Sequence, residues 1–164
     1  MADWADVVTP NPVFMQEAIR LAIEGVNAGR GGPFGAVVVK DAQIIGRGCN
    51  QVTSTNDPTA HAEIVAIRDA CQKLGTFNLA GCEIYASCEP CPMCLATIYW
   101  SRIERFYYGC TAADAAAIGF SDEVIRQELG LSVERRSVAA IPLLRAKALA
   151  AFAAWQSKQD RVEY

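Results

Sequence analysis

The sequence predicts an α/β fold in which helices are layered against a mixed sheet of five strands. Two observations predict this class. Short stretches typical of strands alternate with longer stretches whose apolar residues recur at helical spacing. Two strands also follow one another directly near the start, whereas helices separate the later strands. The first pair is therefore expected to form a hairpin, and the later strands to run parallel.

The chain is expected to begin with a helix over residues 12–27, whose apolar face contains Phe14, Ala18, Leu21, Ala22 and Ile23. A glycine-rich loop follows at residues 29–35, without the Lys-Ser/Thr pair or the following helix of a phosphate-binding loop. We expect either a simple turn or a close backbone approach to a flat ligand, with Phe34 at its edge. Residues 36–40 and 44–49 are the hairpin strands.

The middle of the chain contains two helices that are each expected to begin at a proline. Asp57 is the expected N-cap of the first helix, with Pro58 in its first position and His61 in its first turn. A buried strand over residues 82–86 leads into the second helix, which is expected to run from Pro90 to about residue 100.

The last third of the chain is predicted to be mostly helical. We expect a strand at residues 105–109, short helices at 112–118 and 122–129, and the fifth strand at 133–138. A final helix carries an apolar stripe formed by Leu144, Ala148, Phe152 and Trp155. Because no repeat or linker interrupts the sequence, residues 1–164 are expected to form one domain.

Composition indicates a folded protein with a small-molecule partner. Of the 164 residues, 52% are hydrophobic and 20% are charged, which suits one domain with a substantial core. The net charge is −3, and basic residues are scattered among acidic ones. The absence of a basic stripe argues against a nucleic-acid partner.

The seven cysteines do not predict a disulfide framework, because their number is odd and the chain exceeds 100 residues. Residues 1–6 lack the basic and apolar regions of a signal peptide. The longest apolar run, residues 148–155, is too short to span a membrane. We therefore expect a cytoplasmic protein with no membrane partner.

His61, the only histidine, forms the pattern of a zinc site with Cys91 and Cys94. Zinc prefers four ligands, and a catalytic zinc keeps one position for water. With one histidine available, cysteine must supply most of the protein ligands. Two thiolates and one imidazole leave the ion enough charge to lower the pKa of water toward about 7. We expect one Zn²⁺ per chain.

Cys88 leaves an alternative open, because it also has C-x-x-C spacing to Cys91. A closed site of Cys88, Cys91, Cys94 and His61 would be a structural zinc module, with no position for water. However, Cys88 precedes Pro90 at the end of a predicted strand, where it should point away from the other two cysteines. A redox dithiol of Cys91 and Cys94 is a further alternative, but it gives no reason for His61.

Glu63 is the candidate catalytic carboxylate. Two residues along a helix correspond to a rotation of about 200°, so His61 and Glu63 cannot both bind one ion from a regular helical face. With His61 as the ligand, Glu63 can accept the proton of the bound water and deliver it to the substrate and the leaving amine. Without the cysteine motif, Glu63 would be expected to be a solvated charge.

The chain resembles the cytidine deaminase-like superfamily over nearly its whole length, and within it the bacterial guanine deaminase family. The resemblance rests on the H-x-E and P-C-x-x-C motifs and on residues 24–27, 31–36, 55–63, 87–94, 98–100 and 163–164. It implies a three-layer α/β/α fold with a central mixed sheet. It also implies zinc-dependent hydrolysis of guanine to xanthine and ammonia, with deamination of guanosine, or of another nucleobase or nucleoside, as the alternative.

The resemblance implies roles for further residues. Asp122 is implied to be catalytic and to recognise the edge of guanine through hydrogen bonds. The implied substrate contacts are Asn50, the backbone of Ala62, Phe34, Trp100, Asp122 and Tyr164. Without the resemblance, Asn50 would be a turn residue, Trp100 a core residue and Asp122 a helix N-cap. The family often has Asp-Asp where this chain has Ser121-Asp122, so only the first of these positions departs from the pattern.

The resemblance also implies a homodimer. The C-terminal segment, about residues 156–164, is expected to cover an active site. That site is either its own or, in a domain-swapped dimer, that of the partner subunit.

Overall fold

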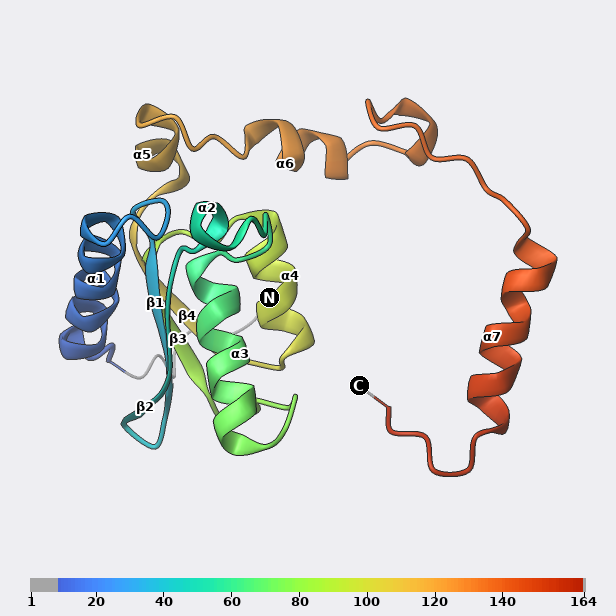
Figure 1. The fold of residues 1–164 in the computed structure, drawn as a ribbon, viewed down its shortest axis with the longest axis horizontal. Helices are drawn as coiled ribbons and strands as arrows, with labels where there is room; N and C mark the ends of the chain where they lie inside the picture. The colour runs from blue at the N-terminus through green and yellow to red at the C-terminus, as the bar shows by residue number, and fades with distance from the viewer. Residues whose placement is uncertain (1–8, 164) are drawn as a thin grey trace. The chain divides into compact units, whose positions relative to one another are not determined.

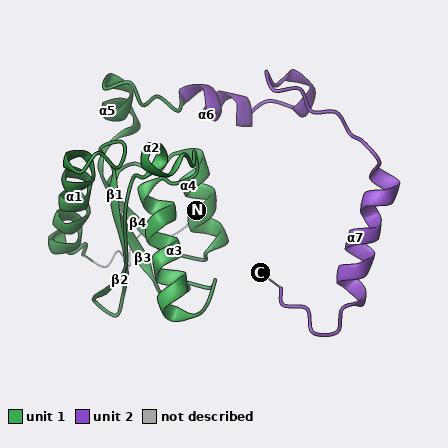
Figure 2. Ribbon diagram, viewed as in Figure 1, with its two compact units in different colours: residues 1–122 green, residues 123–164 purple. Residues whose placement is uncertain are grey.

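A computed structural model describes residues 9–163 of the chain (Figure 1). The chain divides into two compact units, residues 1–122 and 123–164 (Figure 2). The first unit contains the sheet and all three predicted zinc ligands.

The sheet of the first unit is mixed and has four strands in the order β2-β1-β3-β4. Strand β1 (Gly35–Lys40) pairs antiparallel with both β2 (Gln43–Cys49) and β3 (Glu83–Cys88). Strand β3 pairs parallel with β4 (Arg105–Cys110). The structure thus confirms the predicted hairpin and the predicted parallel pair.

The prediction of a fifth strand at residues 133–138 is wrong. This segment contains a short 3-10 helix, η2 (Val133–Arg135), and the sheet formed by the described residues has four strands. The three consecutive charged residues Glu134, Arg135 and Arg136 break the alternation of apolar and polar side chains that a half-buried strand requires.

Helices cover both faces of this sheet, which gives the first unit three layers (Figure 1). Helix α1 (Pro12–Asn27) packs on one face, over a buried cluster of Phe14, Val37, Val39 and Tyr85. Helices α3 (Ala62–Leu74) and α4 (Pro92–Trp100) pack on the other, over a larger cluster that includes Ala36, Val38, Ala66, Ile84, Ala86 and Ile98. The short helices α2 (Val52–Thr55) and α5 (Ala112–Ala117) complete the unit.

A close approach of backbones fixes the start of α3 against the sheet. A Cβ atom added at Gly48 of β2 would lie 2.2 Å from the carbonyl oxygen of Ala62, the first residue of α3. Any other residue at position 48 would push the helix away. Gly48 therefore sets the position of the helix start that carries His61 and Glu63.

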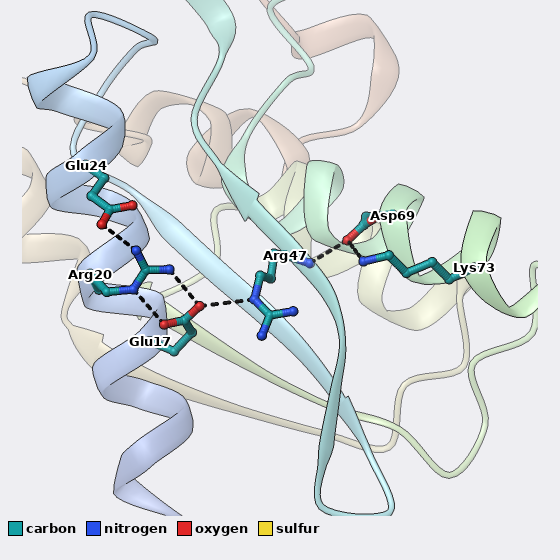
Figure 3. Close-up of polar contacts among 6 residues, drawn as sticks. All are labelled: Glu17, Arg20, Glu24, Arg47, Asp69 and Lys73. Atoms are coloured by element: carbon teal, nitrogen blue, oxygen red, sulfur yellow. Dashed lines mark hydrogen bonds and ion pairs between the residues drawn. The ribbon is translucent and has the colours of Figure 1, made fainter.

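Charged side chains hold the outer strand β2 between the two helical layers (Figure 3). Arg47 donates from Nε to Glu17 of α1 at 3.1 Å and from its backbone N–H to Asp69 of α3 at 2.9 Å. Glu17 also pairs with Arg20, and Asp69 pairs with Lys73. These contacts occupy an edge strand that could otherwise pair with another chain.

The second unit has no buried core of its own. It contains α6 (Glu123–Leu129), η2 and α7 (Arg145–Ser157), and none of its described residues is buried. Within residues 9–163, no helix combines the length and apolar character that crossing a membrane requires.

Candidate metal centre

The structure brings His61, Cys91 and Cys94 together in the first unit. The Nδ1 atom of His61 lies 3.6 Å from Sγ of Cys91 and 3.5 Å from Sγ of Cys94, and all three donor atoms lie within 4.8 Å of one another. Ordinary Zn–N and Zn–S bond lengths in a tetrahedron place nitrogen and sulfur about 3.5 Å apart. The three side chains therefore fit a zinc ion without rearrangement, and they leave the fourth tetrahedral position to a non-protein ligand.

Two helix starts deliver these ligands. His61 is the N-cap of α3 and Cys91 is the N-cap of α4, both with extended backbone, and Cys94 lies buried in the first turn of α4. The carbonyl groups of His61 and Cys91 accept the first helical hydrogen bonds, from Val65 and Leu95. The positive ends of both helices thus point at the donor atoms, where they favour thiolate over thiol.

Both helices begin later than the sequence indicated. The side chain of Asp57 accepts hydrogen bonds from the backbone and hydroxyl of Thr59, so residues 57–60 form a turn and α3 starts after His61. In α4 the proline in the first turn is Pro92 rather than Pro90. Cys91 therefore precedes α4 as its N-cap, and its sulfur still lies within 4.8 Å of that of Cys94.

The donors are coupled by hydrogen bonds. The contact with Cys94, and then the one with His61, lowers the pKa of the Cys91 thiol to about 4, so Cys91 is a thiolate at neutral pH. The same contact with Cys91, together with burial, raises the pKa of Cys94. The hydrogen bond with Cys91 raises the pKa of His61. A cation at the centre would replace the shared protons.

Glu63 lies beside these donors without being one of them. Its side chain is buried, at 7% exposure, in the first turn of α3, and its carboxylate is not part of the donor group. Burial is the main cause that raises the pKa of Glu63. A buried carboxyl with a raised pKa beside a metal centre is suited to accepting and donating protons near neutral pH.

Asn50 is held in one orientation close to the glycine-rich loop. Its Oδ1 accepts hydrogen bonds from the backbone N–H groups of Gly32 at 3.1 Å and Val52 at 3.2 Å. A Cβ atom at Gly31 would lie only 2.3 Å from this oxygen, so the loop needs glycine there. Because its Oδ1 already accepts two hydrogen bonds, the buried Asn50 can offer only its amide N–H groups to a ligand.

Phe34 packs edge-on against Phe120, with ring centroids 5.1 Å apart, and its carbonyl accepts from the backbone N–H of Asn50 at 2.9 Å. It also borders an apolar cavity of about 660 Å³ between α1, the end of β4 and α5. None of the three zinc donors lines this cavity.

The remaining predicted residues take different positions. Ala62 is buried as the first residue of α3. Trp100 is the last residue of α4, is 66% exposed, and its backbone lies about 13 Å along the helix axis from that of Cys91. Asp122 is partly buried at the end of the first unit. Tyr164 lies outside the described residues.

Cys88 does not join the metal centre. Its buried thiol lies 3.5 Å from the carbonyl oxygen of Thr111, and burial raises its pKa to about 11. The closed four-ligand site considered from the sequence is therefore not formed. The sequence does not predict the contacts of Glu89, which directly precedes Pro90, or of Phe120, which lies two residues before Asp122.

Comparison with known proteins agrees with this geometry. The profile of the cytidine and deoxycytidylate deaminase zinc-binding region matches residues 9–110, which include all three donors, so the ion that the site holds is zinc. Guanine deaminase from Bacillus subtilis is 49% identical over 151 residues, which cover 92% of this chain and 97% of that protein.

Solved structures and more distant relatives extend the comparison. The X-ray structure of Bacillus subtilis guanine deaminase has a TM-score of 0.91 and 47% identity, over 95% of this chain and 99% of the other. A tRNA-specific adenosine deaminase from Agrobacterium fabrum is 46% identical, but over only 52% of this chain and 57% of the relative. The chain therefore belongs to the cytidine deaminase-like superfamily, and within it to the family of bacterial guanine deaminase.

Proposed function

We propose that the protein hydrolyses guanine to xanthine and ammonia. The observation that carries this proposal is the pairing of a three-donor zinc site with a buried carboxylate, Glu63, that is not a ligand. The near full-length similarity to a guanine deaminase supports the choice of base.

Glu63 moves the protons of the reaction. Zinc, when bound, acts as a Lewis acid that lowers the pKa of water from about 15.7 toward about 7. Glu63 accepts a proton from the attacking water and delivers it to the ring nitrogen next to C2 of guanine. It then carries a second proton to the departing amine, so one water is consumed and one ammonia released. Its raised pKa lets the same group accept and donate.

The base is bound by groups around the glycine-rich loop. Asn50 donates from its amide to an acceptor of the purine, because its oxygen is already occupied by Gly32 and Val52. Phe34 and the backbone of Ala62 line the base. We further assign Trp100 and Tyr164 to enclosure of the ring.

Asp122 distinguishes guanine from adenine in this proposal. A carboxylate accepts from the N–H groups of guanine, whereas adenine presents an acceptor at the corresponding ring nitrogen. Leaving such an acceptor unpaired costs the wrong base about 1–3 kcal/mol. A tRNA substrate fits less well, because the chain carries a net charge of −3.

The whole chain acts as one deaminase domain in a homodimer, with residues 156–164 over the partner's site. Helix α7 supports this arrangement, since it exposes the apolar side chains of Leu149, Phe152 and Trp155. Such side chains are stabilised by contact with another surface.

A substrate panel tests the proposed function. Ammonia release is measured with guanine, guanosine, cytosine and adenine at equal concentration. We expect guanine to have the highest kcat/KM. A higher value for guanosine would favour a nucleoside deaminase, and a higher value for adenine or cytosine would reject the base assignment.

A further inference from the structure

Glu89 links the segment that leads into the zinc ligand Cys91 to helix α5. It directly precedes Pro90 and Cys91, and its Oε2 accepts a hydrogen bond from the backbone N–H of Ala112 at 3.1 Å. Its own backbone N–H donates to the carbonyl of Cys110 at 2.8 Å, which continues the pairing of β3 with β4. Both contacts fix the chain where it leaves the sheet for the zinc ligand Cys91.

The hydrogen bond from Ala112 to the Glu89 side chain adds to the N-terminal capping of α5, which neighbouring residues otherwise provide. Thr111 and Asp114 form a capping box, in which the Thr111 hydroxyl accepts from the Asp114 backbone at 3.2 Å and the Asp114 carboxylate accepts from the Thr111 backbone at 2.8 Å. This box does not use the N–H of Ala112, the first residue of α5. A carboxylate at this position also interacts favourably with the helix dipole.

The other end of α5 meets the proposed base-binding loop. The chain turns at Gly119, which has a φ of 92°, and the backbone N–H of Phe120 donates to Ala115 at 3.0 Å. The Phe120 ring packs edge-on against Phe34. A Cβ atom at Gly32 would lie within 3.2 Å of both rings, and Gly32 is the residue whose N–H orients Asn50.

We infer that Glu89 is a positioning residue for base binding: it anchors α5, which holds Phe120 against Phe34 and thereby fixes the wall of the base site. The inference rests on the proposed function, in that Phe34 and Asn50 are taken to bind the base. Glu89 touches neither the zinc nor the substrate in this scheme. Its loss should weaken base binding more than it slows the chemical step.

The test compares E89A with E89Q and with a matched control. In E89A we expect zinc to stay near one per chain and KM for guanine to rise about tenfold, with a smaller fall in kcat. E89Q keeps an acceptor oxygen and should restore KM to within about twofold of the wild type. The control is E104A, because Glu104 accepts from the backbone N–H of Gly81 at 3.0 Å in the same manner. It should leave KM unchanged.

Hydrogen exchange over residues 112–120 gives a readout that does not depend on turnover. We expect faster exchange there in E89A, and wild-type exchange in E89Q and E104A. Unchanged exchange or unchanged KM in E89A would overturn the inference, and so would loss of zinc from E89A or failure of E89Q to restore KM. If the wild type does not accept guanine, the proposed function fails, while the exchange result still decides the role of Glu89.

Discussion

At the scale of single residues, the zinc ligand His61 and the proposed proton carrier Glu63 are separated by two positions in the chain. His61 lies outside α3 as its N-cap, in extended backbone, whereas Glu63 is already helical and buried. Helical rotation alone predicts that His61 and Glu63 have different roles, but it places His61 inside the helix. The two residues differ because His61 is the N-cap. Its extended backbone lets the imidazole face Cys91 and Cys94, whereas Glu63 lies in the first turn of the helix and is not one of the donors.

Replacing Glu63 with Gln tests this division. E63Q keeps the size of the side chain but cannot accept a proton, so we expect zinc near one per chain and a fall in turnover of about 10²-fold or more. Metal analysis and the absorbance change from guanine to xanthine measure the two properties. E134Q, at an exposed glutamate, is the control. Substantial guanine hydrolysis by E63Q would contradict the proton-carrier role.

The orientation of Asn50 leads to a second prediction. In N50D a carboxylate oxygen can still accept from Gly32 and Val52, but the amide donor is lost. We expect thermal stability close to that of the wild type and at least a tenfold higher KM for guanine, which corresponds to one lost hydrogen bond. N50A should lose both stability and affinity. A wild-type KM in N50D would show that the base does not use this donor.

At the scale of elements, strand β2 depends on charges from both helical layers. Glu17 is central, because its hydrogen bond with Arg20, and then the one with Arg47, lowers its pKa from 4.5 to about 2 (Figure 3). A carboxyl whose pKa is lower in the folded state stabilises the fold above its unfolded pKa. That contribution is lost as the pH falls from about 4.5 toward about 2.

E17Q should therefore be less stable than the wild type at pH 7, by about 1 kcal/mol or less, since such pairs are screened by solvent. The difference should shrink as the pH falls through this window, because the wild type then loses the same charge. Thermal unfolding of both proteins in a pH series measures it. E24Q removes a more exposed partner of Arg20 and should have a smaller effect. A constant difference down to pH 2 would contradict the role of the Glu17 charge.

The elements also show which features could be predicted from sequence. Long amphipathic stretches such as α1 were predicted at their observed bounds, since one apolar face determines them. Helix starts were placed too early, because the side chain of Asp57 can cap a turn as well as a helix. Residues 133–138 do not form the predicted strand, because their charges leave no apolar face to pair.

At the scale of the whole molecule, the zinc site was predictable because its donors are close in sequence to recognisable motifs. The contacts of the proposed base site were harder to predict from sequence. Asn50 depends on contacts with Gly31 and Gly32, 18 or more residues earlier, and the tether from Glu89 to Ala112 joins two strand ends. Such long-range contacts leave no periodic signal in the chain. The assignments of Trp100 and Tyr164 to enclosure of the base stay predictions.

Complementation between two inactive variants tests whether the C-terminal segment acts on the partner's site. E63Q keeps its own Tyr164 but lacks the proton carrier, and a variant without Tyr164 has the reverse defect. If the segment crosses to the partner, co-expressed chains form heterodimers in which one site joins an intact Glu63 with an intact Tyr164. Random pairing should then restore about a quarter of the wild-type activity. Each variant alone is the control. Activity that stays at the level of the separate variants would mean that each chain covers its own site, because then no pairing can unite the two intact residues.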